Sequence, residues 1–191
     1  MRNDLNMRIF RYFFTRLWYT NAHEVRHTVN ADEQMMNAAL DEAKRALSLG
    51  ELPVGAVVVR DGQIIARGHN DREGSKDPTG HAEIVAMRRA AKALGGWRLS
   101  GCTLYVTLEP CPMCAGAIVQ ARVDRVVWGC ADVQSGCAGS VYRIPEDPAF
   151  AHFAVCEGGV LEEQCKTQMY AFFSERRKAR QDACQDQADL L

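Results

Sequence analysis

The hydrophobic positions along the chain become regular after residue 31. Apolar residues at helical spacing predict a helix that ends at Gly50, with Asp32 as its N-cap. The pattern then changes to the shorter apolar runs that are typical of strands. Asp61-Gly62 is a predicted hairpin turn between two of them, residues 54–60 and 63–68.

The rest of the chain alternates helical and strand-like segments. Helices are predicted over residues 81–94, 112–121 and 160–180, and strands over residues 102–107, 123–129 and 153–156. Strands separated by crossover helices favour a mostly parallel sheet, with the opening hairpin as its one antiparallel pair. The predicted fold class is therefore α/β, a three-layer α/β/α sandwich around a five-stranded mixed sheet.

One domain with two extensions is expected. The domain spans residues 32–180, an N-terminal extension spans 1–31, and a C-terminal tail with few core-forming residues spans 181–191 and is expected to fray. The N-terminal extension is rich in arginine and aromatic residues and is expected to be poorly ordered. A transit peptide is the alternative, because such segments are Arg-rich and acid-poor, and a short helix docked on the domain or on a partner is a third interpretation.

Composition narrows the class of protein. With 47% hydrophobic and 25% charged residues, the chain is not fibrous or largely disordered, and a net charge of −1 argues against a strongly basic nucleic-acid binder while leaving a local basic patch open. No uncharged run approaches the roughly 20 residues of a membrane-spanning helix. The 191 residues do not need disulfide staples, so the eight cysteines and the absence of a convincing secretory signal predict a reducing compartment, the cytoplasm, with most cysteines packed in the core.

Two short motifs carry the candidate chemistry. His81-Ala-Glu83 and Pro110-Cys111-Pro-Met-Cys114 each stand at the start of a predicted helix. Two cysteines three residues apart in a first helical turn lie on one face and can bind the same ion. The positive end of the helix dipole also favours the thiolate form that zinc requires. His81, Cys111 and Cys114 are therefore the predicted ligands of one zinc ion.

Three protein ligands are typical of a catalytic zinc site. A structural site closes the fourth position with protein, and the sequence has no second CxxC or HxxxH pair to do so. A zinc ion with an open position makes a water molecule nucleophilic at neutral pH. Glu83 lies two residues after His81, near the metal without ligating it, and is the predicted catalytic group that transfers protons.

Each residue type also has a simpler explanation when it is taken alone. A lone CxxC is often a redox pair or half of a zinc ribbon, His81 alone would be a capping or core histidine, and Glu83 alone would be an acid favoured by the helix dipole. Together, an H-x-E motif followed by P-C-x-x-C is typical of zinc-dependent nucleobase deaminases.

The stretch from Gln34 to Arg177 closely resembles the bacterial tRNA-specific adenosine deaminases. The matching segments are residues 51–56, 77–83, 103–117, 129–132 and 136–140 and the pair Phe172-Phe173. The resemblance implies a cytidine-deaminase-like fold, a homodimer, one zinc ion per subunit and no organic cofactor. It also implies hydrolytic deamination of adenosine to inosine at the wobble position of a tRNA anticodon stem-loop.

The resemblance also assigns substrate contacts. Asn70 matches a residue that hydrogen-bonds the purine, and the backbone amide of Ala82 matches a contact to the base beside the metal. Asp132 matches a loop position near the substrate backbone. Phe173 and Arg176 match the C-terminal helix that lies along the anticodon loop.

The residues alone leave the substrate open. An aromatic side chain beside arginines suits stacking and phosphate contact with a single-stranded RNA loop, but Phe172 and Phe173 could equally face the core beside a solvated helix end. A zinc deaminase of a free base or nucleoside, of the guanine or cytosine type, would use the same motifs. A non-catalytic zinc module that binds RNA would instead need a fourth protein ligand.

Overall fold

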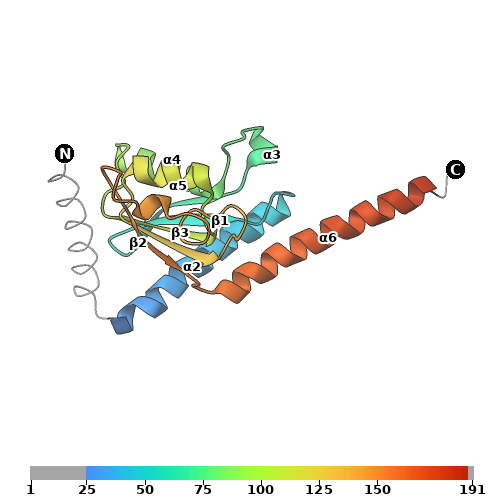
Figure 1. The fold of residues 1–191 in the computed structure, drawn as a ribbon, viewed down its shortest axis with the longest axis horizontal. Coiled ribbons are helices and arrows are strands. Elements are labelled where there is room, and N and C mark those ends of the chain that lie inside the picture. Colours follow the sequence, from blue (N-terminus) through green and yellow to red (C-terminus); the bar gives the residue numbers. More distant parts are fainter. Residues whose placement is uncertain (1–24, 189–191) are drawn as a thin grey trace.

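The structure is a computed structural model that describes residues 25–188. A five-stranded sheet lies between two layers of helices, so the predicted three-layer α/β/α sandwich is confirmed (Figure 1). Helices α2 and α6 cover one face of the sheet, and α4 and α5 cover the other. The elements in chain order are α2 (Val25–Ser48), β1 (Gly55–Arg60), β2 (Gln63–His69), α3 (Arg72–Ser75), α4 (Ala82–Leu94), β3 (Cys102–Leu108), α5 (Pro112–Ala121), β4 (Arg125–Cys130), the 3-10 turn η1 (Ile144–Glu146), β5 (Val155–Gly158) and α6 (Glu162–Ala188).

The strand order is β2-β1-β3-β4-β5, and the sheet is less parallel than its crossover helices suggest. The pairs β3–β4 and β4–β5 are parallel, but β1 runs antiparallel to both β2 and β3. The expectation of a single antiparallel pair is therefore wrong at β1–β3. The reason is that the connection through α4 places β3 beside β1, so β3 is parallel to β2 without being its neighbour.

Two apolar clusters stabilise the sandwich, one on each side of the sheet. Central strand β1 is buried on both faces: Val58 packs towards α4 and α5, and Val57 packs towards α2. On β2, a Cβ atom at Gly68 would lie 2.6 Å from the backbone of Ala82 and Ala86. The missing side chain therefore lets the first turn of α4, which carries the candidate site, rest directly on the sheet.

Helix α2 begins at Val25, so the predicted N-cap at Asp32 is wrong. Asp32 lies inside the helix, where its carboxylate accepts a 2.6 Å hydrogen bond from the Tyr105 hydroxyl and two from the Arg125 guanidinium. Most of the N-terminal extension expected over residues 1–31, including its aromatic cluster, lies outside the described residues.

Helix α6 continues to Ala188, past the end expected at residue 180. Its C-terminal part extends beyond the edge of the sheet (Figure 1). Residues 189–191, the end of the expected tail, lie outside the described part of the chain. Among the described helices, none combines the length and the apolar character that crossing a membrane requires.

Candidate metal centre and active site

The first turns of α4 and α5 meet and bring three metal-ligating side chains together. His81 and Cys111 occupy the N-cap positions of α4 and α5, and Cys114 lies in the first turn of α5. Nδ1 of His81 lies 3.6 Å from Sγ of Cys111 and 3.6 Å from Sγ of Cys114. The three ligand atoms all lie within 4.8 Å of one another, and no fourth His, Cys, Asp or Glu among the described residues joins the group.

These distances fit a tetrahedral zinc ion. With zinc–sulfur bonds of about 2.3 Å and zinc–nitrogen bonds of about 2.0–2.1 Å, two ligands at a tetrahedral angle are separated by about 3.5 Å. The His81 nitrogen and each cysteine sulfur have very nearly that separation. One histidine and two thiols are also the donor types that zinc prefers. The protein therefore has a site for one zinc ion, held by three side chains.

The cysteines are free thiols rather than a disulfide, and their electrostatics suit metal binding. A hydrogen bond from the Cys114 thiol lowers the pKa of Cys111 to about 4, which favours its thiolate. The same hydrogen bond, together with burial, raises the pKa of Cys114, so Cys114 rather than Cys111 holds the shared proton. A bound zinc ion would take both sulfurs as thiolates and would displace this proton.

Glu83 is a buried carboxyl group beside the metal ligands. It lies in the first turn of α4 with only 4% of its surface exposed, and it interacts with the Cys114 thiol. Burial raises the pKa of Glu83 above the ordinary value of a glutamate. A carboxyl group with a raised pKa holds a proton more readily near neutral pH, which is the property that a group serving as both base and acid needs.

A cavity of about 160 Å³ opens over two of the metal ligands, His81 and Cys111. Its walls include three further predicted site residues, Asn70, Glu83 and Asp132. The Asn70 side chain is fixed there, because its Nδ2 donates a 2.8 Å hydrogen bond to the buried carboxylate of Glu51. The cavity therefore combines a metal site, a buried carboxyl group and an oriented amide.

Glu109 shapes the opposite wall of this cavity. Its buried carboxylate accepts hydrogen bonds from the backbone amides of Asp132 (3.1 Å), Ala138 (3.1 Å) and Ser140 (2.8 Å), and from the Ser140 hydroxyl. A Cβ atom at Gly136 would lie 2.3 Å from this carboxylate. The loop after β4 therefore wraps around the Glu109 carboxylate, which approaches residue 136 so closely that only glycine fits there.

A second, larger cavity of about 660 Å³ adjoins the first and shares Leu52, Leu108 and Asp132 with it. Its other walls are the loop over residues 130–134 and one side of α6, including Tyr170 and Phe173. Both aromatic side chains are exposed, by 68% and 42%. We call this second cavity the α6 groove.

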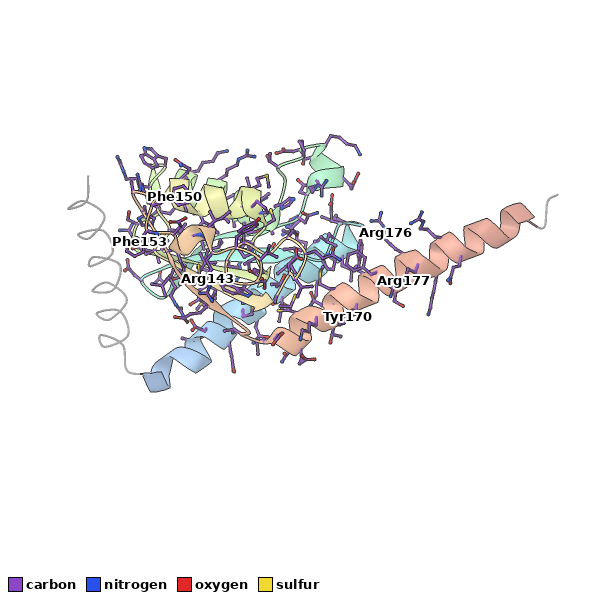
Figure 2. All side chains as sticks on the ribbon, in the orientation of Figure 1. Arg143, Phe150, Phe153, Tyr170, Arg176 and Arg177 are labelled. Carbon is purple, nitrogen blue, oxygen red and sulfur yellow. The ribbon has the colours of Figure 1, made fainter. Side chains whose placement is uncertain are left out.

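The two adjacent phenylalanines of α6 have different environments. Phe172 is 6% exposed and belongs to the packed interior, whereas Phe173 lies in the α6 groove, with the two rings edge to face at 5.4 Å. Arg176 lies over the ring of Phe172 at 5.1 Å and lines neither cavity. Figure 2 shows Tyr170, Arg176 and Arg177 following one another along α6. Each of the two interpretations of this helix therefore holds for one ring: Phe172 faces the core, and Phe173 is exposed, as an RNA-stacking side chain must be.

The structure brings most of the predicted site residues together. Two of them, Ala82 and Arg176, line neither cavity. Ala82 is buried at the first position of α4 and does not line the cavity, although an amide in a first helical turn has no partner within the helix. Sequence reasoning missed Glu51 and Glu109. Each is a single acid beside a buried strand or apolar stretch, and a buried acid there must be paired, which is the signal that could have found them.

Known proteins match the part of this chain that contains the metal ligands. Residues 29–130 match the family model of the cytidine and deoxycytidylate deaminase zinc-binding region. A tRNA-specific adenosine deaminase of Bacillus subtilis is 51% identical over 152 residues, which cover 80% of this chain and 94% of that protein.

Two solved structures extend the comparison. One, from a study of A-to-I editing by tRNA:A34 deaminases at the wobble position of transfer RNA, has a TM-score of 0.68 at 42% identity and covers 71% of this chain and 98% of its own. A guanine deaminase from Bacillus subtilis has a TM-score of 0.50 at 44% identity but covers only 52% of this chain and 64% of its own. The match that spans most of both chains decides the family. With its His-Cys-Cys site, this chain belongs to the family of zinc-dependent tRNA-specific adenosine deaminases.

Proposed function

We propose that this protein converts adenosine to inosine by hydrolytic deamination at the wobble position of a tRNA anticodon. The observation that carries the proposal is the continuity of the site: the cavity over the metal ligands opens beside the α6 groove, with exposed Phe173 in its wall. A cavity for one base that adjoins an aromatic groove suits a base taken out of an RNA loop and neighbours that stack on the protein.

We assign the chemistry to four residues. His81, Cys111 and Cys114 hold the zinc ion, which supplies Lewis-acid chemistry to water and substrate when it is bound. Glu83 takes one proton from the attacking water and delivers it to N1 of the purine, and it then carries the second proton from the new C6 hydroxyl group to the departing amine. Adenosine and water thus give inosine and ammonia. Its burial beside the ligands and its raised pKa support both directions of transfer.

We assign recognition to the residues around the chemistry. Asn70, held by Glu51, presents its amide to the purine, and the first-turn amide of Ala82 contacts the base beside the metal. Asp132 lies in the wall that the cavity and the α6 groove share, where the substrate backbone would pass. Phe173 stacks on a loop base, and Arg176 lies farther along α6, within reach of a longer RNA.

The test is a deamination assay with the zinc-loaded protein on four substrates. These are an anticodon stem-loop RNA with adenosine at the wobble position, free adenosine, guanine and cytidine. We expect turnover of the stem-loop to inosine and none of the three small molecules. Efficient release of ammonia from guanine or cytidine, without RNA turnover, would instead establish the alternative, a zinc deaminase of free bases or nucleosides.

We also propose that the protein is a homodimer, with α4 and α5 at the interface. A shallow groove of about 370 Å³ lies between these helices and is lined mainly by apolar residues, including Ile84, Met87, Ala117 and Trp97, which is 55% exposed. A face formed by two neighbouring helices can pair with its own copy about a two-fold axis. Trp97→Glu is expected to give a monomer by light scattering, whereas Leu49→Glu, at another exposed apolar residue, is expected to leave the dimer intact.

We place the protein in the cytoplasm. Seven of the eight cysteines, all except Cys184, are described, and these seven are free thiols. This is expected of a protein kept in a reducing compartment. Thiol labelling of the native protein taken directly from cells would test this, since a secreted protein would carry oxidised cysteines.

A further inference from the structure

The rim of the catalytic cavity carries a cation, Arg72, that has no partner among the side chains that the structure describes. Arg72 is the first residue of the short helix α3 and lines the cavity together with Asn70, His81 and Glu83. Its side chain is exposed, and it forms no ion pair or hydrogen bond with any side chain that the structure describes. Its acidic neighbours Asp71 and Glu73 are not within ion-pair distance.

The other cations near the site are already neutralised. Lys166, in the wall of the α6 groove, pairs with Glu162 at 2.7 Å and with Glu163 at 3.2 Å. Arg88, on α4, pairs with Asp77 at 3.3 Å. In the described walls of the two cavities, Arg72 is thus the one arginine or lysine whose charge is available to an anion.

The backbone turn that carries Arg72 is held in place by Glu51, the residue that also orients Asn70. One oxygen of the buried Glu51 carboxylate accepts 2.8 Å hydrogen bonds from the backbone amides of Glu73 and Gly74, and the other accepts the hydrogen bond from Asn70. The backbone amide of Asp71 donates a 2.9 Å hydrogen bond to the carbonyl of Gly80. The turn that carries Arg72 is therefore fixed to the same carboxylate as the amide in the cavity.

Another residue of the cavity wall, Asp132, is acidic and does not suit an anion. Its carboxylate accepts hydrogen bonds from the backbone amides of Gln134 (3.0 Å) and Ser135 (3.1 Å), which hold it in place. A phosphate would be repelled by this carboxylate and attracted to Arg72. A substrate backbone that passes Asp132 therefore cannot set the flanking phosphate against that carboxylate, and Arg72 is the favourable contact for it.

We infer that Arg72 binds a phosphodiester group that flanks the target nucleoside. The guanidinium offers two parallel donors to phosphate oxygens, and the contact exists only when the nucleoside is part of a nucleic-acid strand. Arg72 is thereby a specificity residue that separates RNA from free nucleosides. This inference rests on the proposed RNA substrate and names one point at which the strand is held.

The test uses the zinc-loaded full-length protein and the anticodon stem-loop RNA with adenosine at the wobble position. Arg72→Ala is expected to raise KM about tenfold with little change in kcat, as for the loss of one charged hydrogen-bonded contact. The slope of log(kcat/KM) against log[salt] should become shallower by about 0.7, because one fewer phosphate is neutralised. A residue that merely supports the fold would not change this slope.

Two variants serve as controls. Lys76→Asn removes a cation from the end of the same turn, and asparagine tolerates the left-handed conformation of that residue, at φ 54°. It is expected to leave KM and the salt slope unchanged. Arg72→Lys keeps the charge and is expected to keep the wild-type salt slope while recovering only part of the loss in KM.

Neutralised phosphates identify the contact independently of any variant. Two further stem-loops carry a methylphosphonate on the 5′ or the 3′ side of the target adenosine. One of them should cost the wild-type enzyme about the same factor as Arg72→Ala, and cost Arg72→Ala nothing more. Equal losses for both enzymes at both positions would overturn the assignment. Absence of wild-type turnover on the unmodified stem-loop would instead refute the proposed function.

Discussion

Arg125 at the start of β4 and Asp32 in α2 form a two-pronged ion pair, with hydrogen bonds of 2.8 and 2.7 Å from the two terminal guanidinium nitrogens. Both side chains are about nine-tenths buried. Tyr105 and Glu157 complete the group, so α2, β3, β4 and β5 are joined through one arginine. The pair fixes helix α2 to the face of the sheet opposite the active site.

Asp32→Asn is expected to lower the free energy of unfolding by about 3 kcal/mol, because it leaves the buried guanidinium with only the more exposed Glu157 as an anionic partner. Urea unfolding followed by circular dichroism measures the difference. Asp41→Asn breaks an exposed ion pair with Lys44 and is the matched control, with an expected effect below about 0.5 kcal/mol. Equal effects of the two substitutions would contradict the role of the buried pair.

The same ion pair predicts a pH dependence. Burial alone would raise the pKa of Asp32, but hydrogen bonds from Arg125 and Tyr105 outweigh it and hold the pKa below its ordinary value. Stability from a lowered carboxyl pKa is present above the unfolded value of about 3.9 and is lost as the pH falls through the folded value. The stability gap between wild type and Asp32→Asn should therefore be constant from pH 7 to about pH 5 and narrow below about pH 4.

Glu83→Ala is expected to reduce kcat on the stem-loop by at least about a thousandfold, because the site loses its proton-transfer group. Zinc content by mass spectrometry should stay at one per subunit, since the three ligands are untouched. Glu33→Ala, at an exposed residue of α2, serves as the control with wild-type kcat. Turnover within tenfold of wild type in the Glu83 variant would remove this residue from the mechanism.

Glu109→Gln is expected to loosen the loop over residues 131–140 while zinc remains bound. The glutamine amide would place a donor among backbone amides that now donate to a carboxylate, so about 2 kcal/mol of hydrogen bonding is lost. Hydrogen exchange of Ala138 and Ser140 should become much faster, and KM for RNA should rise. Unchanged exchange at these two amides would show that the loop is held by other contacts.

Phe172 and Phe173 form a matched pair for separating folding from recognition. Phe172→Ala removes a buried ring and should lower the free energy of unfolding by about 3 kcal/mol. Phe173→Ala removes an exposed ring from the α6 groove and should cost little stability but raise the Kd for the stem-loop about tenfold, as for one lost base stack. Identical profiles in melting and binding experiments would falsify this division.

Local signals predicted the parts of the structure that are themselves local. The turn at Asp61 and Gly62 has positive φ at both residues, which is the conformation that an Asp-Gly hairpin favours. Helix α5 begins at Pro112, directly after Cys111, as the proline indicates. The metal ligands follow from the spacing of a few residues in two first turns, so they too were readable from the sequence.

Long-range pairing was not readable in the same way. Nothing in the period of a strand says which neighbour it will take, so the placement of β3 beside β1 was missed. Asp32 has the residue type and position of an N-cap, and only its partner Arg125, far along the chain, shows otherwise. Glu51 and Glu109 likewise act through backbone amides of distant loops: an acid in an apolar stretch indicates that a partner exists, but no residue pattern shows which amides supply it.

The order of the site along the chain has an evolutionary consequence. Every metal ligand, Asn70 and Glu83 precede the end of β4 at Cys130, whereas the walls of the α6 groove lie mostly after it. Apart from Asn70, Arg72 and Ala82, the residues assigned to substrate recognition thus follow the residues assigned to the chemistry along the chain. Insertions or exchanges after Cys130 can redirect the enzyme to another molecule without touching the groups that react, and laboratory selection for new substrates should accumulate its changes there.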